Sequence, residues 1–423
     1  MKVIKNTSIY LGASLISKGA PFILLPFLTE YLPPEEFGIL AIFLVLNSMM
    51  NAFVGMSMHA NVTKNFFSKT KSELGLITGN VFFVLLITTS FYCLVMLIVV
   101  GLKESFFSVP AKYLLILPPL GFLSMANQIH LSVLRNEGKA YTFGAFELSN
   151  AFLSAAVTIL FLVVFDTGWL SQVIGMTIAS LVVSVIGVSY MFKRGYLRFI
   201  FNKTVIKSIL RLSFPLIPHV LGGVAIATSD RLFIEKLVGL EAVSLYAIGY
   251  SFGKLVTLLT DAYIKAWSPW FYEQLVEPTY QRKATIVKFT YAYIVGIFVF
   301  AYVMSTVGEW FLPYIVDERY VDAAKFIWWI ALGYAVQGVY KIFFPYLVHI
   351  SKTGFLALST VTAAVVNIVL NYFFISQYGA LGAAYSTVVA FAISAFMVFE
   401  YQRHNYPMPW FLREQSKKND ELV

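Results

Sequence analysis

Four basic residues lie inside long apolar stretches of this sequence: Lys18, Arg231, Lys254 and Lys341. A charge at membrane depth costs on the order of a few kcal/mol or more, so such residues need a reason to be there. Basic residues outnumber the clearly central acids, and that excess favours an anionic ligand. A phosphate group offers several acceptor oxygens and up to two charges, which suits three or four cations that face one cavity.

Lys18 is the clearest case, because its amine is far from water. It lies about 11 residues from the start of its span, or about 16 Å along a helix, which is too far for the side chain to reach the surface easily. Ser14 shares its helix face by i, i+4 spacing. Pro21 and Pro26 follow, so the helix is able to bend just beyond the charge.

Three acids also lie inside apolar stretches and are candidate charge partners or ion-coupling residues: Asp230, Asp261 and Glu147. A carboxylate in a low-dielectric environment binds a proton more readily, so coupling to H⁺ is one use and coupling to Na⁺ is another. Lys254, Asp261 and Lys265 recur at helical spacing and form one stripe. Tyr334 and Gln337 share a face with Lys341 in the same way.

Structural roles compete with these functional ones. Asp230 and Arg231 are adjacent, and a buried ion pair often does no more than fix a helix end. Lys265 lies near the end of its span, where it is expected to extend to the interface. Four asparagines in the spans are expected to form interhelical hydrogen bonds rather than to bind a ligand: Asn47, Asn51, Asn367 and Asn371.

The composition places the chain among membrane proteins. Of its 423 residues, 59% are hydrophobic and only 13% are charged, whereas soluble domains carry about 25% charged residues. The single cysteine, Cys93, excludes a disulfide framework and a cysteine metal site. The net charge of +9 does not indicate nucleic-acid binding, because the basic residues recur in every second loop rather than in one patch.

The apolar stretches predict twelve transmembrane helices. Their approximate limits are 7–31, 38–62, 75–101, 112–134, 141–165, 169–192, 212–237, 242–266, 285–308, 324–348, 354–376 and 380–402. Alternate connections carry 21 Lys and Arg residues on one side and five on the other. The positive-inside rule therefore predicts that both termini are cytoplasmic. The basic segments at 193–211 and 267–286 are expected to be amphipathic and interfacial.

The two halves of the chain resemble each other. PPEEFGILAI after the first span matches GLEAVSLYAI after the seventh, and similar matches open the sixth and twelfth spans. A six-helix unit used twice in the same orientation requires a pseudo-twofold axis along the membrane normal, with a site expected between the halves. The predicted fold is thus an all-α integral membrane protein with two six-helix bundles. The predicted divisions are an N-terminal lobe at 1–195, a cytoplasmic linker at 196–211, a C-terminal lobe at 212–404 and a cytoplasmic tail at 405–423.

Three sequence blocks resemble the O-antigen flippases, which are Wzx-type polysaccharide-repeat exporters of the MATE-like MOP superfamily. They are SDRLFIEKLVGLEAVSLYAIGY at 229–250, NIVLNYFFISQYGALGAA at 367–384 and PPEEFGILAI at 33–42. The resemblance spans essentially the whole chain. It implies two six-helix lobes around a cationic central cavity that opens to each side of the membrane in turn.

The resemblance also implies a function and partners. Undecaprenyl-pyrophosphate-linked oligosaccharide repeats would move across the bacterial cytoplasmic membrane, from the inner to the outer leaflet. The expected partners are this glycan, membrane lipids, a polysaccharide polymerase and a chain-length regulator. No metal or cofactor is expected beyond a coupling H⁺ or Na⁺, and the chain is expected not to be an enzyme.

Two other functions remain open. A MATE-type cation-coupled antiporter for drugs or metabolites predicts a cavity dominated by acids, which the mid-span lysines argue against. A membrane polysaccharide polymerase or ligase predicts a sizeable outer loop, whereas the outer connections here are short. The sequence carries no P-loop and no nucleophile–base motif, so ATP hydrolysis is not expected.

Overall fold

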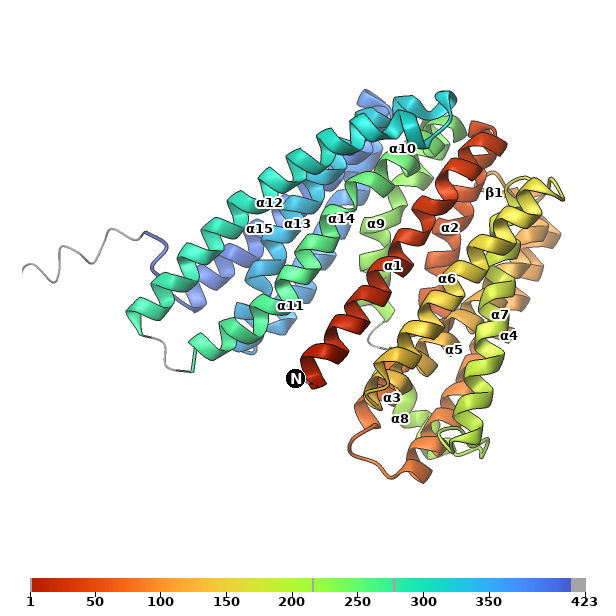
Figure 1. Cartoon of the computed structure of the whole chain (residues 1–423), viewed down its shortest axis with the longest axis horizontal. Helices are drawn as coiled ribbons and strands as arrows, with labels where there is room; N and C mark the ends of the chain where they lie inside the picture. Colours follow the sequence, from red (N-terminus) through yellow and green to blue (C-terminus); the bar gives the residue numbers. More distant parts are fainter. Residues whose placement is uncertain (1, 215–216, 277–278, 412–423) are drawn as a thin grey trace, which may run out of the picture. The chain divides into compact units, whose positions relative to one another are not determined.

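The computed structural model describes residues 2–214, 217–276 and 279–411, and almost all of them are helical (Figure 1). Apolar segments form helices in a bilayer because a helix satisfies its own backbone hydrogen bonds. The earlier helices are α1 (Lys2–Tyr31), α2 (Pro34–Gly55), α3 (His59–Asn65), α4 (Lys71–Leu102), α5 (Leu117–Asn136), α6 (Ala140–Val163), α7 (Leu170–Lys193) and α8 (Lys203–Ser213). The later ones are α9 (Ile217–Leu237), α10 (Leu240–Gly253), α11 (Val256–Gln274), α12 (Tyr280–Ile315), α13 (Ala324–His349), α14 (Thr353–Tyr378) and α15 (Leu381–Asn405).

Short elements complete the connections between helices. An antiparallel hairpin is formed by β1 (Ser105–Phe106) and β2 (Val109–Pro110). The 3₁₀ helices η1 (Ala111–Ile116) and η3 (Glu318–Ala323) precede α5 and α13. These connections are too short to form a domain of their own.

Eleven helices of the described chain are long and apolar enough to cross a membrane, so the protein is a multi-pass integral membrane protein. They match eleven of the predicted spans, which confirms the all-α fold class. The span predicted at 212–237 is occupied by α9, which is helical from Ile217 to Leu237. It carries Asp230 and Arg231 in its interior.

Two predicted spans are interrupted. In the second, Met56 and Ser57 adopt positive φ angles of 44° and 52°, and this turn separates α2 from α3. In the eighth, a turn at Lys254 and Leu255 separates α10 from α11. Lys254 is therefore at a break between two helices rather than in the middle of one.

The two segments predicted to be amphipathic differ from each other. In the first, α8 forms an amphipathic helix that exposes Lys203, Lys207 and Arg211 and buries Ile209. In the second, α11 continues past residue 267 to Gln274 and α12 begins at Tyr280. The amphipathic, interfacial character of 267–286 stays a prediction.

The stretch before α8 is fixed along α4 by asparagine side chains. Asn80 donates from Nδ2 to the carbonyl oxygen of Ile200 and accepts at Oδ1 from the backbone N–H of Asn202, both at 2.8 Å. A Cβ at Gly79 would lie 1.8 Å from the carbonyl oxygen of Arg198, so only glycine permits this approach. Asn202 then caps α8 by accepting from two backbone N–H groups at 3.0 and 3.2 Å.

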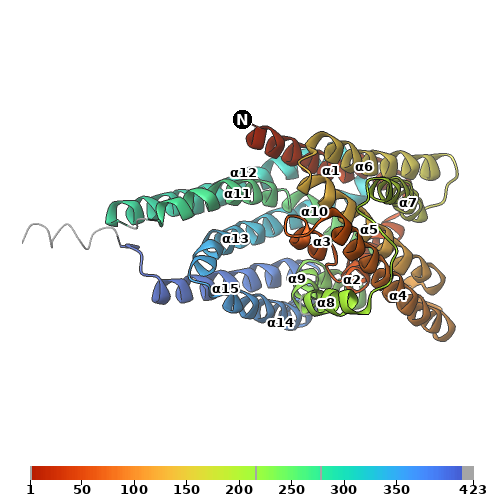
Figure 2. The same ribbon diagram turned by 90° about the horizontal axis from the view of Figure 1, so that it is seen from below.

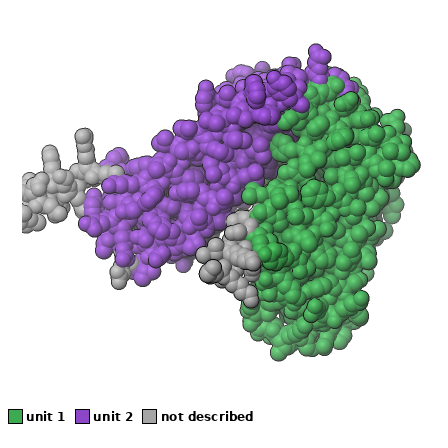
Figure 3. Space-filling view, viewed as in Figure 1, with its two compact units in different colours: residues 1–244, 315–317 green, residues 245–314, 318–423 purple. Residues whose placement is uncertain are grey.

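The chain divides into two compact units, residues 1–244 with 315–317 and residues 245–314 with 318–423 (Figure 3). In the first unit α1 packs on α6, α6 on α7, and α2 on both α5 and α9. In the second, α13 packs on α15 and α11, and α14 packs on α15, and these helices lie side by side in Figures 1 and 2. The predicted lobe limits at 195 and 212 stay a prediction, because a compact unit and a sequence repeat are different divisions of a chain.

Candidate functional site

An ion pair joins two helices of the second unit. The Nζ of Lys341 on α13 donates to Oδ1 of Asp261 on α11 at 2.7 Å. The side chains are 25% and 38% exposed, respectively, so the pair is shielded but reachable. Its short length is typical of a charge-assisted hydrogen bond.

Lys254 lies near the same helices. Its Nζ is 5.8 Å from the ring centroid of Tyr250, within the range of a cation–π contact. The hydroxyls of Tyr250 and Tyr334 are hydrogen-bonded to each other. Tyr334 precedes Lys341 by about two helical turns, so both lie on one face of α13, as the sequence predicted. Two of the predicted cations are thus connected to one face of α13.

Close packing sets the position of this face. A Cβ at Gly338 would lie 2.8 Å from the hydroxyl of Tyr293 and 2.9 Å from Cγ2 of Thr260. Gly338 therefore allows α13 to pack closely against α11 and α12 at a point between Tyr334 and Lys341. Tyr293 also stacks on Tyr263 of α11, with ring centroids 4.2 Å apart.

The other predicted ion pair is a local one. Asp230 is fully buried and Arg231 is 8% exposed. Oδ1 of Asp230 accepts from the backbone N–H of Arg231 at 2.8 Å and from its Nη1 at 3.3 Å. Nη1 also donates to the carbonyl oxygen of Ala227 at 3.2 Å, one turn earlier. All of these contacts lie within α9 of the first unit.

Glu147 is paired through a hydroxyl. Its two carboxylate oxygens accept from Oγ of Ser14 at 3.1 and 3.0 Å, which joins α6 to α1. Ser14 was singled out in the sequence only because it shares a face with Lys18. The side chain of Lys18 lies outside the described residues.

The structure brings some predicted residues together and reveals partners that the sequence did not indicate. Asp261 and Lys341 meet, although nearly eighty residues separate them and no sequence spacing relates them. Tyr250 contacts Lys254 by i, i+4 spacing, which is a signal that the sequence does contain. The assignment of Lys18, Arg231, Lys254 and Lys341 to one substrate site stays a prediction.

The structural alternative is confirmed for two of the asparagines. Asn367 donates to Oγ of Ser386 and Oγ1 of Thr387 at 3.5 and 3.4 Å, which joins α14 to α15. Asn371 donates to Oδ1 of Asn367 at 3.2 Å and accepts from Ser386. These amides are therefore occupied in packing two helices together.

The chemistry of the second unit is that of a displaceable cation. An ammonium that is held by one carboxylate is able to exchange that partner for the oxygens of another anion. Within residues 2–214, 217–276 and 279–411, no group of three or more His, Cys, Asp or Glu side chains is placed to hold a metal ion. A pocket of about 290 Å³ on α11 and α12 is lined by apolar and aromatic residues: Tyr263, Ala266, Trp267, Trp270 and Phe289.

Comparison with known proteins gives a family and a fold. Residues 3–274, more than half of the chain, match the family described as "Polysaccharide biosynthesis protein". Two Haemophilus influenzae proteins are each 24% identical to this chain and each covers 86% of it, over 89% and 90% of their own lengths. One is described as an uncharacterized membrane protein and the other as Lsg locus putative protein 1.

A similar solved structure is the inward-facing conformation of a multidrug resistance MATE family transporter of the MOP superfamily. It has a TM-score of 0.67 and 14% sequence identity, and the alignment covers 96% of this chain and 98% of that one. At this identity the likeness shows the fold alone. The fold is therefore MATE-like.

Proposed function

This chain belongs to the polysaccharide biosynthesis protein family, and from that membership and its transporter fold we propose that it is a flippase for lipid-linked oligosaccharides. The substrate would be an oligosaccharide repeat unit of O-antigen or a similar surface polysaccharide, carried on undecaprenyl pyrophosphate. Family and fold point to a transporter rather than an enzyme. The observation that supports the proposal is the partly exposed Asp261–Lys341 pair in the second unit, with Lys254 near the same helices, in a chain of a polysaccharide biosynthesis family.

The pyrophosphate is the part of the substrate that these residues would bind. Its oxygens would compete with the Asp261 carboxylate for Lys341, and a charge-assisted hydrogen bond to phosphate is as strong as the one it replaces. Lys254 presents an ammonium beside Tyr250. Lys18 and Arg231 complete the proposed set. The polyprenyl chain would remain in lipid while the sugars follow the phosphates.

Movement would occur by alternating access through a cationic central cavity. In this scheme the substrate enters from the cytoplasmic leaflet and displaces Asp261 from Lys341. The freed Asp261 then becomes available to H⁺ or Na⁺, and Asp230 and Glu147 are the further candidates for this coupling. The break at Lys254 and the prolines Pro21 and Pro26 give helices that are able to change direction.

The proposed setting is the bacterial cytoplasmic membrane, with both termini in the cytoplasm. A polysaccharide polymerase and a chain-length regulator would act on the translocated repeats. The excess of basic residues in alternate connections supports this orientation.

Alanine variants test the proposal in cells that depend on this protein for surface polysaccharide. Lys18→Ala, Lys254→Ala and Lys341→Ala are each expected to lower the polysaccharide and to leave lipid-linked repeats in the inner leaflet. Lys265→Ala is the matched control. It also removes one lysine charge, but Lys265 is an exposed residue of α11 that does not belong to the proposed set. Folded protein is measured for each variant by size-exclusion chromatography. Normal polysaccharide from all three variants would refute the proposal.

A cation-coupled antiporter for drugs is the second candidate. It is favoured by the MATE-like fold and by the acids Asp230, Asp261 and Glu147 within the helices. It predicts that deletion of the protein increases drug susceptibility and leaves surface polysaccharide intact. Measuring both phenotypes in one deletion strain separates the two functions.

A further inference from the structure

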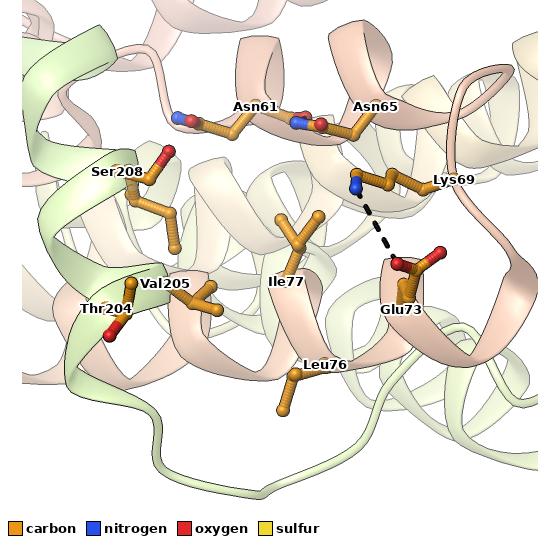
Figure 4. Close-up of a pocket in the computed structure, with 10 residues that line it drawn as sticks. Asn61, Asn65, Lys69, Glu73, Leu76, Ile77, Thr204, Val205 and Ser208 are labelled. Carbon is orange, nitrogen blue, oxygen red and sulfur yellow. Dashed lines mark hydrogen bonds and ion pairs between the residues drawn. The ribbon is translucent and has the colours of Figure 1, made fainter.

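A pocket of about 250 Å³ lies in the first unit, among α3, α4 and α8 (Figure 4). Polar side chains line it from α3, α8 and the α3–α4 loop: Asn61, Asn65, Lys69, Thr204 and Ser208. Apolar side chains of α4 and α8 line the rest: Leu76, Ile77, Val205 and Ile209, with Glu73 at one end. A pocket divided in this way suits an amphiphile, which has a polar head and an apolar tail.

Lys69 is the cation in this pocket, and its present partner holds it loosely. Nζ of Lys69 lies 3.6 Å from Oε1 of Glu73, and the side chains are 44% and 50% exposed. Exposed pairs of this kind contribute little. The other oxygen of Glu73 is occupied, because it accepts from the backbone N–H and the hydroxyl of Thr70, both at 2.9 Å. The Lys69 ammonium therefore has donors to offer to an incoming anion.

The surroundings of the pocket are strongly basic. Residues 59–76 and 196–214 contain seven Lys and Arg residues: Lys64, Lys69, Lys71, Arg198, Lys203, Lys207 and Arg211. The same two segments contain one acidic residue, Glu73. Clusters of four to eight basic residues on an amphipathic helix or beside a membrane helix are typical of binding to anionic lipids.

Exposed apolar residues flank the same segment. Phe199, Ile200 and Phe201 precede α8 and are 53%, 58% and 64% exposed, and Phe214 follows it at 68%. Phe67, beside Lys69, is 81% exposed. An amphipathic helix with basic residues on one face and flanking aromatics lies in the membrane interface, where lipid head groups are found.

We propose that this pocket binds the phosphate of an anionic phospholipid from the surrounding membrane. Lys69 would engage the phosphate, the amide of Asn65 and the hydroxyl of Ser208 would hydrogen-bond the head group, and the acyl chain would lie against Ile77 and Val205. The site belongs to the first unit alone and does not depend on which substrate the protein transports. A bound lipid would hold α8 against α3 and α4.

Lipid retention by the full-length protein tests this site. The protein is placed in nanodiscs of phosphatidylglycerol and phosphatidylcholine at varied ratios, and bound lipid is read by native mass spectrometry after release. Wild type is expected to retain phosphatidylglycerol preferentially. Lys69→Gln is expected to weaken that retention about fivefold, the usual effect of one basic residue at an anionic membrane. Ser208→Leu, which occupies the pocket and leaves the charge unchanged, is expected to remove the preference.

Lys193→Gln is the matched control, because it removes one exposed charge from the same unit outside the pocket. Equal retention by the Lys69→Gln and Lys193→Gln variants would overturn the proposal, since general surface charge would then account for the binding. Competition by inorganic phosphate at millimolar concentration would also overturn it, because the site would then take a free anion rather than a lipid. Should Ser208→Leu fail to fold, the comparison of the two lysine variants still decides the matter.

Discussion

The Asp230–Arg231 and Asp261–Lys341 pairs both lie on helices of the described chain, but they differ in sequence separation and in exposure. Asp230 and Arg231 are adjacent on α9, and both are almost inaccessible. Asp261 and Lys341 come from two helices and remain partly exposed. A buried pair has little contact with water, so removing one of its partners is strongly destabilising. A partly exposed pair is able to exchange its partner for water or for a ligand. The loss of the first pair is therefore expected to affect folding first, and the loss of the second is expected to affect substrate binding first.

The largest effect is expected from Asp230→Leu. The variant leaves Arg231 in a buried position without its carboxylate, and breaking a buried pair costs about 3–5 kcal/mol of folding free energy. The loss is measured as reduced thermal stability and reduced yield of monodisperse protein in detergent. Asp230→Leu combined with Arg231→Met should recover much of the stability, because the buried positive charge is then gone as well. A single variant as stable as wild type would contradict a structural role for this pair.

Lys341→Ala is expected to affect transport more than folding. Loss of a charge-assisted hydrogen bond to phosphate, worth about 1.5–3 kcal/mol, lowers substrate affinity about tenfold or more. The measurement is translocation of lipid-linked oligosaccharide by the purified protein in vesicles. Lys341→Arg, which keeps the charge, should retain part of the activity. Equal losses in both variants would show that position rather than charge is required.

Asp261→Asn sharpens the contrast with Asp230. Because the Asp261–Lys341 pair is partly exposed, its loss should change the free energy of unfolding by less than about 1 kcal/mol. The same unfolding assay compares Asp230→Asn with Asp261→Asn. The distinction between the two pairs would fail if both variants lost the same stability.

A third pair, in the connection between α5 and α6, extends the comparison to groups outside the membrane spans. Nζ of Lys139 lies 3.0 Å from Oε2 of Glu137, whose side chain is 12% exposed. The carboxylate also accepts from the hydroxyls of Tyr190 and Tyr196, both at 2.9 Å. Burial raises the pKa of Glu137, but hydrogen bonds from the lysine and the two tyrosines outweigh it and hold the pKa below its ordinary value of 4.5.

The neighbours of Glu137 shift in the complementary direction. Hydrogen bonds to Tyr190 and Glu137 raise the pKa of Lys139. Burial and the bond to Glu137 raise the pKa of Tyr196 to about 12. The network is thus most stable when Glu137 is ionised and the other two groups keep their protons.

The smallest effect is expected from Glu137→Gln. Because the pKa of Glu137 is lowered in the fold, its stabilisation is present above pH 4.5 and is lost as the pH falls through the folded value. The contribution of Lys139, whose pKa is raised, is present below pH 10.5 and is lost as the pH rises beyond it. As the pH is lowered, the unfolding temperature of the Glu137→Gln variant should fall less steeply than that of wild type. Glu104→Gln, at an exposed acid, is the control, and identical slopes for all three proteins would exclude the network as a source of pH dependence.

The sequence alone was sufficient to predict the transmembrane helices. Apolar stretches of membrane length must form helices, because no other local structure satisfies the backbone away from water. For the same reason a described helix occupies each predicted span, although the second and eighth spans are interrupted by turns. The predicted roles of Asn367 and Asn371 were also correct, because both amides form hydrogen bonds between α14 and α15.

What the sequence by itself determined is what depends on neighbours along the chain: the spans, the Asp230–Arg231 pair and the shared face of Tyr334 and Lys341. The tertiary structure alone decided contacts between distant segments. Periodicity reports which residues share a face but not which helices pack together. Nothing in the spacing of residues 261 and 341 indicates that they meet. The close packing of α13 at Gly338, which no local pattern specifies, fixes where the face that carries Lys341 lies.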